Sequence, residues 1–175
     1  MTTTATLTQV PVRSPRTADV TFADYYALVE LNARYASALD TGDWDAWPEF
    51  FEEVCRYEVV PRENHERGLP LALLSFESKG MLKDRVYGIK ETLFFDPYYQ
   101  RHIIGTPLIT YLDDSIIEAR TNYAVLRTKS EQATDVYNAG FYIDRIRRTE
   151  RGLRFESRIC VYDSEMVPNS IIYPI

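Results

Sequence analysis

Histidine and cysteine are scarce in this sequence of 175 residues, which contains two of each. The histidines are His65 and His102. The cysteines, Cys55 and Cys160, lie far apart and form no Cys-x-x-Cys unit. An iron–sulfur cluster with mixed ligands needs paired cysteines and histidines, and a mononuclear iron site needs two histidines and a carboxylate. We therefore expect no metal, no cofactor and no disulfide framework in this chain, with both cysteines buried as small hydrophobic residues.

Positive charge and long apolar runs are also lacking. The formal net charge of -6 argues against general binding to nucleic acid or anionic membranes. No apolar run approaches the roughly 18 to 20 residues that would span a bilayer, and the N-terminus does not resemble a signal peptide. The seven glycines do not cluster into a phosphate-binding loop, and no Gly-x-Ser-x-Gly motif occurs. We expect a cytoplasmic protein without nucleic-acid or membrane partners.

The chain is long enough for one domain. Residues 1–20 are rich in threonine, contain Pro11 and Pro15, and show little periodicity, which favours a flexible N-terminal arm. We expect residues 21–175 to form a single α+β domain. This part is rich in tyrosine, whose apolar ring and polar hydroxyl suit half-buried surfaces and interfaces.

The first half of this domain has helical patterns. Leu28, Leu31, Tyr35 and Leu39 recur at spacings of three and four and predict one buried helix face from about residue 21 to Gly42. A second short helix is expected over residues 45–51. A third, capped by Ser78, is expected over residues 81–93. Residues 56–60 and 69–76 read as extended, residues 61–64 as a turn, and residues 94–99 as an aromatic loop.

The second half has long runs of β-branched and aromatic residues. Strands are expected over residues 103–112, 116–129, 135–147 and 153–163. In the last strand Leu153, Phe155, Ile159 and Val161 alternate with Arg154, Glu156 and Arg158, which predicts one apolar and one polar face. Gly140 suggests a bulge or bend in the third strand. Helices followed by a meander of strands favour a curved antiparallel sheet wrapped around the first long helix, forming a cone that can enclose a pocket.

One pair of residues could perform acid–base chemistry in such a pocket. Asp40 ends the first helix and His102 begins the strand region, and the carboxylate could orient the imidazole for proton transfer. This interpretation predicts a stand-alone dehydratase or isomerase. The alternative is that Asp40 caps the local backbone near Gly42 while His102 packs with one ring nitrogen bonded. A ligand-binding or docking module without catalysis is a third interpretation.

Charged and aromatic clusters provide candidate interfaces. Arginines surround the turn between the last two strands, with Asp144, Glu150 and Glu156 nearby, so the cluster is either a solvated face or a subunit contact. Residues 62–67 form a second dense polar cluster, and residues 171–175 are apolar. We expect Tyr98, Tyr99 and residues 171–175 to be exposed and buried only by other subunits, so that deleting residues 171–175 weakens assembly or solubility. The candidate interface residues are Arg62, Glu63, Asn64, Arg67, Tyr98, Tyr99, Arg145, Arg147 and Tyr173.

Several motifs together resemble a known family. Leu39-Asp40 followed by residues 42–51 (GDWDAWPEFF) is similar to the opening of the NTF2-like, cone-shaped superfamily. Tyr57-x-Val59, residues 62–64 (REN), 68–71 (GLPL), 80–86 (GMLKDRV) and the closing 158–164 (RICVYDS) resemble the small β subunit of Rieske-type aromatic-ring-hydroxylating dioxygenases. The resemblance covers about residues 22–175.

The resemblance implies an NTF2-like (cystatin-like) cone that serves as a structural, non-catalytic β subunit. It implies an α3β3 hexamer, with the Rieske [2Fe–2S] cluster and mononuclear Fe(II) in the large α subunit. Electrons would come from NAD(P)H through a reductase and ferredoxin. The pattern is most similar to members that act on aromatic carboxylates, such as salicylate 5-hydroxylases and terephthalate dioxygenases.

Overall fold

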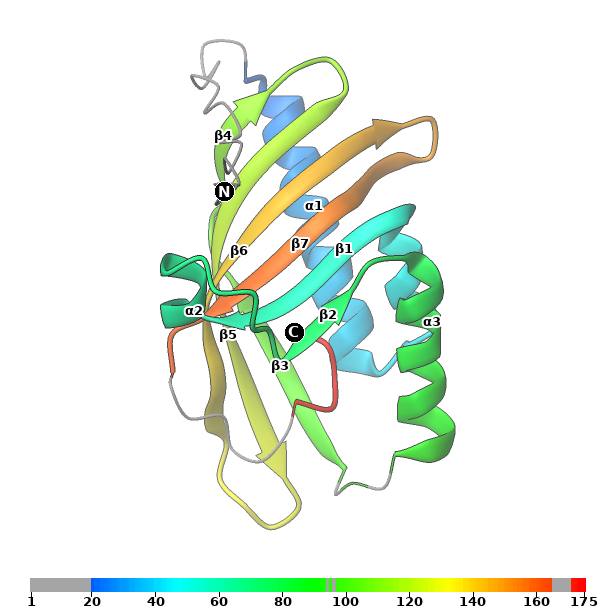
Figure 1. Cartoon of the computed structure of the whole chain (residues 1–175). Helices are drawn as coiled ribbons and strands as arrows, with labels where there is room; N and C mark the ends of the chain where they lie inside the picture. Colours follow the sequence, from blue (N-terminus) through cyan, green and yellow to red (C-terminus); the bar gives the residue numbers. More distant parts are fainter. Residues whose placement is uncertain (1–19, 94, 96, 165–170) are drawn as a thin grey trace, which may run out of the picture.

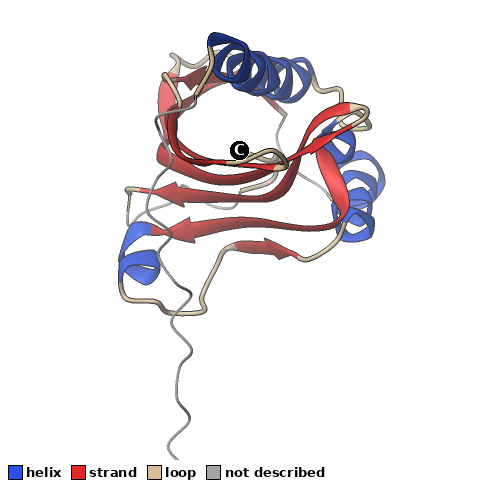
Figure 2. Ribbon diagram, turned by 90° about the horizontal axis from the view of Figure 1, so that it is seen from above, coloured by secondary structure: helices blue, strands red, loops and turns tan. Residues whose placement is uncertain are grey.

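A curved seven-stranded sheet packs around one long helix in the computed structural model, which describes residues 20–93, 95, 97–164 and 171–175. The helix α1 (Phe22–Thr41) lies across the concave side of the sheet (Figures 1 and 2). The expected α+β class is confirmed. The predicted N-terminal arm lies outside the described residues except for Val20. None of the described helices is long and apolar enough to cross a membrane.

The ends and the buried face of α1 are encoded locally. Thr21 caps the helix because its hydroxyl accepts the Asp24 N–H (3.2 Å) and its own N–H donates to the Asp24 carboxylate (3.0 Å). At the other end Gly42 adopts a φ of 72°, the left-handed conformation that glycine takes without strain. Leu28, Leu31, Tyr35 and Leu39 are buried, as their spacing predicts.

The segment after α1 is more strand-like than predicted. The expected helix over residues 45–51 is only the four-residue 3-10 helix η2, and the polar turn is a short helix. The strand predicted over residues 56–60 is longer at both ends. In chain order these elements are η2 (Trp47–Phe50), β1 (Phe51–Pro61), α2 (Arg62–Glu66), β2 (Leu74–Phe76), α3 (Lys79–Tyr87) and the π-helical turn η3 (Gly88–Thr92). Ser78 caps α3 as predicted, accepting the Met81 N–H at 3.3 Å.

The remaining elements are strands. They are β3 (Tyr98–Ile104), β4 (Leu108–Leu112), β5 (Ile116–Lys129), β6 (Asp135–Thr149) and β7 (Gly152–Tyr162). The single strand predicted over residues 103–112 is wrong, because Gly105 and Pro107 interrupt it and Pro107 has no N–H to donate to a ladder. β3 and β4 both pair with β5. Tyr98 and Tyr99, predicted in a loop, belong to β3.

The sheet order is β2-β1-β7-β6-β5-β3, with β4 also beside β5. The prediction of a purely antiparallel sheet is wrong at one position, because β1 and β7 are parallel. These two strands lie at opposite ends of the domain sequence, and a parallel pair needs a long connection. β7 thereby becomes a central strand, flanked by β1 and β6.

An extra residue in β7 reverses the expected alternation of its side chains. Arg145 pairs with Ser157 whereas Ile146 pairs with Phe155, so Glu156 is the additional residue of a bulge. Side chains beyond the bulge change face. Phe155 and Cys160 therefore lie in the main core, whereas Ile159 and Val161 pack in a smaller cluster with Val60 and Phe141. The predicted single apolar face of β7 is wrong for this reason.

Gly140 does not form the bulge that its position suggested. It pairs in register with Tyr123 and Tyr162, and the register shifts of β6 lie elsewhere. A Cβ atom at Gly140 would lie 1.9 Å from the Val161 carbonyl oxygen and 2.8 Å from the Tyr162 Cα. The curvature of the sheet brings the backbone of β7 so close that only glycine fits.

We predict that Gly140→Ala destabilises the domain by at least about 3 kcal/mol, because backbone atoms would have to move. Thermal unfolding followed by circular dichroism measures this. Gly80→Ala is the matched control, since its Cβ would meet only the Ser78 hydroxyl at 3.6 Å. In the α3 helix this control should be neutral or up to about 1 kcal/mol stabilising. Equal melting temperatures for Gly140→Ala and the wild type would contradict the close approach.

Candidate functional site

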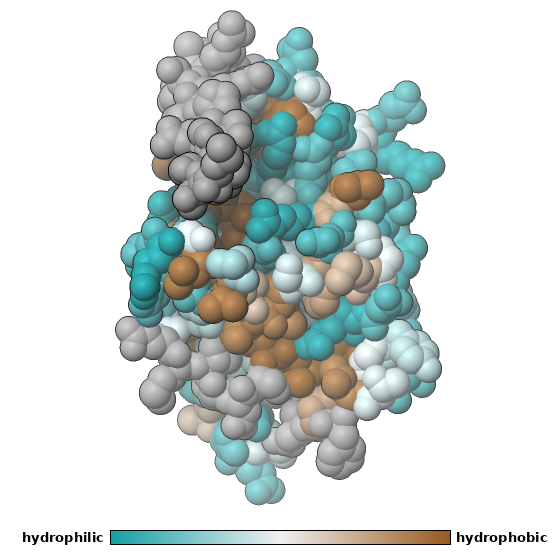
Figure 3. Space-filling view, in the orientation of Figure 1, coloured by the Kyte–Doolittle hydropathy of each residue, from teal (hydrophilic) through white to brown (hydrophobic). Residues whose placement is uncertain are grey.

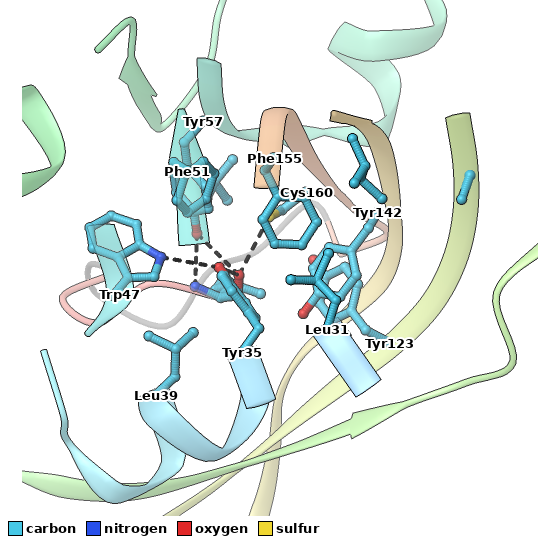
Figure 4. Packing of buried hydrophobic residues seen from close by; sticks show 14 of the residues in the cluster. Leu31, Tyr35, Leu39, Trp47, Phe51, Tyr57, Tyr123, Tyr142, Phe155 and Cys160 are labelled. Carbon is cyan, nitrogen blue, oxygen red and sulfur yellow. Dashed lines mark hydrogen bonds between the residues drawn. The ribbon is translucent and has the colours of Figure 1, made fainter. Parts of the chain in front are cut away.

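The interior of the cone is occupied by the chain's own residues 171–175. Ile171 and Ile175 are buried, and the C-terminal residue lies inside the ring of strands (Figure 2). The Ile175 carbonyl oxygen accepts hydrogen bonds from the Tyr35 hydroxyl (2.8 Å) and the Tyr57 hydroxyl (3.2 Å), and the Ile175 N–H donates to the Tyr57 hydroxyl (2.8 Å; Figure 4). The segment is therefore fixed by backbone hydrogen bonds as well as by packing.

Aromatic rings surround these hydrogen bonds. Trp47 donates from Nε1 to the Tyr35 hydroxyl at 3.3 Å, and Phe155 packs edge-on against Tyr35 (Figure 4). Burial raises the pKa of Tyr35 and of Tyr57 well above the usual value, so both hydroxyls stay neutral near pH 7. The guanidinium of Arg85 in α3 holds the same segment from outside, donating to the carbonyl oxygens of Ile171 (2.7 Å) and Ile172 (2.8 Å).

A fully buried ion pair lies deeper under α1. Arg158 donates from Nε and Nη2 to the two carboxylate oxygens of Asp144, each at 2.8 Å, and from Nη2 to the Asn32 side-chain oxygen at 2.5 Å. Neither charged side chain is exposed. Burial alone would lower the pKa of Arg158, but Asp144 raises it above the ordinary value. The rings of Tyr35, Tyr142 and Phe155 cover the guanidinium, with centroids 4.0 to 4.3 Å from its central carbon.

Two sequence expectations fail at this ion pair. The alternation of β7 predicted an exposed Arg158, and Asp144 was expected to be an acid beside the surface arginines. The bulge at Glu156 turns Arg158 inward, where it pairs with Asp144 of the neighbouring strand β6. No local signal in the sequence marks a bulge at Glu156.

Asp40 and His102 do meet, as the acid–base interpretation required. His102 Nδ1 lies 2.6 Å from the Asp40 carboxylate, which also accepts the His102 backbone N–H at 3.0 Å. The expected local cap by Asp40 is wrong, because its carboxylate links the last turn of α1 to β3. His102 is buried with one nitrogen bonded, as the second interpretation held; its Nε2 has no hydrogen-bond partner among the described residues. Both residues border a groove between α1 and β3, and their side chains are at most 5% exposed.

The charged candidates on α2 are engaged mainly with one another. Arg62 pairs with Glu66 (3.0 Å) and Asp163 (2.9 Å), and Arg67 pairs with Glu63 (2.7 Å). Asn64 donates to the Leu71 carbonyl oxygen at 2.9 Å. These side chains are about half exposed and remain candidates for an interface.

The aromatic candidates differ in exposure. Tyr99 is 80% exposed, whereas Tyr173 is only 8% exposed and packs against Tyr98 with ring centroids 4.5 Å apart. The expectation that Tyr98, Tyr173 and residues 171–175 lie open at the surface is wrong. The side chains that pack on Tyr98 and Tyr173 belong to the same chain, and Arg85 ties the segment down. Tyr99 alone of these candidates is a large, open aromatic side chain.

The arginines of the β6–β7 hairpin divide into two groups. Arg145 and Arg147 form ion pairs with Glu118 and Glu156 on the outer face of the sheet. Arg151 and Arg154 instead face a groove beside α1. Arg145 and Arg147 are thus paired within the chain and remain candidates for an interface, whereas Arg151 and Arg154 have different neighbours.

The described part of the chain contains no cluster of three or more histidine, cysteine, aspartate or glutamate residues that could hold a metal ion. His65 lies on α2 with its ring against Phe141, far from the Asp40–His102 pair in the fold. Both cysteines are free and buried as predicted, and burial raises the pKa of Cys55 to about 11 and of Cys160 to about 12. These residues do not fit the ligand sets of a Rieske or mononuclear iron site.

The sequence matches the family described as ring hydroxylating beta subunit over residues 34–169. The chain belongs to this family. It is 34% identical to the anthranilate 1,2-dioxygenase small subunit of Burkholderia cepacia, covering 86% of this chain and 94% of that protein. It is 32% identical to beta subunit 2 of the terminal oxygenase component of terephthalate 1,2-dioxygenase from Comamonas sp., covering 85% and 96%.

A solved structure confirms the fold of this ring-hydroxylating β subunit. It is a chain assigned as the β subunit of an aromatic-ring-hydroxylating dioxygenase from Novosphingobium aromaticivorans, with 34% identity and a TM-score of 0.80. The alignment covers 87% of this chain and 97% of that one. The NTF2-like cone and the family resemblance expected from the sequence are thereby both confirmed.

We predict that breaking the buried ion pair costs far more than removing it. Arg158→Met or Asp144→Leu alone should destabilise the subunit by about 3 to 5 kcal/mol, because one charge is left buried without its partner. The double variant Arg158→Met/Asp144→Leu should recover most of this loss. Urea unfolding of the four proteins gives the coupling energy. Additive single effects would show that the pair is not buried as described.

The surface pair provides the control for this cycle. Arg145→Met removes ion pairs with Glu118, which is 42% exposed, and with Glu156, which is 18% exposed and keeps Arg147 as a partner. It should therefore cost less than about 1 kcal/mol. A cost as large as that of Arg158→Met would indicate that burial does not distinguish the two pairs.

We further predict that deleting residues 171–175 opens the interior. The Tyr35 and Tyr57 hydroxyls lose their partners and several buried apolar side chains are removed, so the loss should exceed about 3 kcal/mol. The melting temperature and the binding of a hydrophobic dye measure this. Val136→Ala, at a side chain that is 65% exposed, is the control and should leave both unchanged. A truncated protein as stable as the wild type would contradict the interior position of the segment.

Proposed function

We propose that this chain is the non-catalytic small subunit of an aromatic-ring-hydroxylating oxygenase. The observation that carries the proposal is the filled interior of the cone. Residues 171–175 occupy the space in which a cone-shaped enzyme would hold a substrate, and two buried tyrosines hold Ile175 there. A subunit with a closed interior acts through the surfaces that it offers to its neighbours.

The redox chemistry then belongs to the large subunit. We place the Rieske [2Fe–2S] cluster and the mononuclear Fe(II) in that partner, because the histidines and cysteines of this chain do not fit such sites. The assembly would be an α3β3 hexamer in which the small subunits also contact one another. A reductase and a ferredoxin would supply electrons from NAD(P)H. The two free thiols agree with a reducing, cytoplasmic location.

We infer that the oxygenase acts on an aromatic carboxylate, such as salicylate. The relatives reported above are named for anthranilate and terephthalate, which are both aromatic carboxylates. The choice among such acids would be made mainly in the pocket of the large subunit.

Exposed apolar side chains support a role in assembly. Leu71 is 63% exposed and Leu73 is 49% exposed in the connection between α2 and β2. Figure 3 shows the molecule in the orientation of Figure 1, with hydrophobic side chains gathered in the middle of the visible face. Such side chains are commonly buried by a partner. Together with Tyr99 and the charged residues of α2, they form candidate contacts with other subunits.

The Asp40–His102 pair has a structural role that requires no catalysis. Its hydrogen bonds join the end of α1 to β3, and both side chains are buried. The dehydratase or isomerase interpretation would instead require His102 to reach a substrate in the interior, where the chain's own residues lie.

The test is co-expression of this chain with its candidate partner, a Rieske-type large subunit from the same genome. We predict that the two co-elute as one complex and that only the complex hydroxylates an aromatic acid. The variant His102→Gln should keep most of the turnover per iron in this complex. If His102 were an acid–base catalyst, turnover would fall by about two to four powers of ten. Turnover by the isolated chain, or failure to co-elute, would overturn the proposal.

A further inference from the structure

An open groove runs along one side of α1. Its walls are α1 and the tip of the β6–β7 hairpin, and η2 contributes to its floor. Along α1 the lining residues are Ala27, Glu30, Leu31 and Arg34, which follow the three- and four-residue spacing of one helix face. The groove is distinct from the filled interior and from the surface beside Asp40 and His102.

The groove carries positive charge on an acidic protein. Four of the six charged side chains that line it are arginines, although the whole chain has a formal charge of -6. Arg148 is paired with Asp24. Within the described residues, Arg34, Arg151 and Arg154 have no carboxylate within 4 Å. The acid Glu49 is already paired with Lys79 at 2.8 Å. The groove therefore presents guanidinium groups that form no ion pair with the described residues, although Arg151 and Arg154 also line a neighbouring pocket with Glu52, Glu53 and Glu150.

Between these arginines the floor is apolar. Leu31, Phe50 and Leu153 line it and belong to three different elements. An apolar centre edged by arginine is the composition that protein interfaces favour. A bound small molecule is usually enclosed over most of its surface, whereas this groove is open to solvent along its length. The shape and composition together favour a polypeptide segment over a free small molecule.

We propose that this arginine groove, defined by Arg34, Arg151 and Arg154 around Leu31, Phe50 and Leu153, docks an acidic segment of the large subunit. Carboxylates of that segment pair with the free guanidinium groups, and an apolar or aromatic side chain of it packs on the floor. The proposal rests on the proposed function, which supplies the partner.

Charge distinguishes this occupant from the chain's own N-terminal segment. Residues 1–19 contain Arg13 and Arg16 against a single acid, Asp19, so this segment does not complement the groove. The large subunit is the partner that the proposed function supplies, and an acidic segment of it complements the arginines. Docking of a second copy of this chain is an outcome that the crosslinking test below distinguishes.

The first test uses the co-expressed complex. The double variant Arg34→Glu/Arg151→Glu reverses one charge on each wall of the groove and breaks no ion pair among the described residues. We expect the fraction of small subunit that co-elutes with the large subunit to fall at least about tenfold, since like charges then face each other. The control, Arg56→Glu/Lys90→Glu, reverses two charges that are 58% and 43% exposed and whose ion-pair partners, Glu58 and Asp45, do not line the groove. It should stay within about twofold of wild type.

The melting temperature of each free subunit shows whether the variants fold. Co-elution of the groove variant at the wild-type level, or an equal loss in the control, would overturn the docking site. These results differ from failure of the proposed function, in which the wild-type subunits themselves would not co-elute.

The second test identifies the occupant. A photo-crosslinking amino acid at position Thr149, on the groove wall, should link to a segment of the large subunit that contains aspartate or glutamate. Links to another copy of this chain would overturn the proposal. Benzoate is added in parallel as a free carboxylate. One outcome is that millimolar benzoate saturates the groove of the wild type but not of the variant, while the variant still co-elutes with the large subunit. The groove is then a small-anion site, and the docking proposal fails.

Discussion

Two tyrosine hydroxyls close the interior of this subunit by binding the backbone of Ile175. Tyr35 comes from α1 and Tyr57 from β1, so their hydrogen bonds to one residue fix the helix, the sheet and the end of the chain together. Burial keeps both hydroxyls neutral, which allows them to donate without placing a second charge beside Arg158. Because residues 171–175 fill this space in the described part of the chain, we expect the cone to act through its surfaces.

The bulge at Glu156 provides a second constraint. It turns Arg158 into the core, where Asp144 and Asn32 satisfy most of its donors and three aromatic rings cover it. The same shift sends Ile159 and Val161 to the outer face, where they pack with Phe141 beneath α2. The extra residue thus places the Arg158–Asp144 ion pair in the core. It also places Ile159 and Val161 beneath α2, which carries candidate interface residues. A buried ion pair adds little net stability, but it specifies one register because any other leaves a charge unpaired.

The sequence predicts those parts of the fold that depend on local patterns. The buried face of α1, its glycine stop, the Ser78 cap and the long strands β5 to β7 follow from spacing and turn residues. The parallel β1–β7 pair, the bulge and the inward course of residues 171–175 depend on contacts between distant segments, which periodicity cannot show. For the same reason the sequence left open whether Asp40 meets His102 or caps the local backbone, and Tyr173 was expected at the surface. The sequence shows the arginines of the β6–β7 hairpin as one cluster. Only the fold shows that Arg151 and Arg154 line the groove, whereas Arg145 and Arg147 lie on the outer face of the sheet.

The closed interior can be tested most directly by amide hydrogen exchange of the free subunit. We expect the amides of Tyr57 and Ile175 to exchange as slowly as the amides of the central strands β5 and β6. Added aromatic carboxylates should not change these exchange rates. Both regions would then open in the same global unfolding event. Rapid exchange of Ile175 while β5 and β6 stay protected would contradict the account, because the interior would then open locally and could admit a substrate.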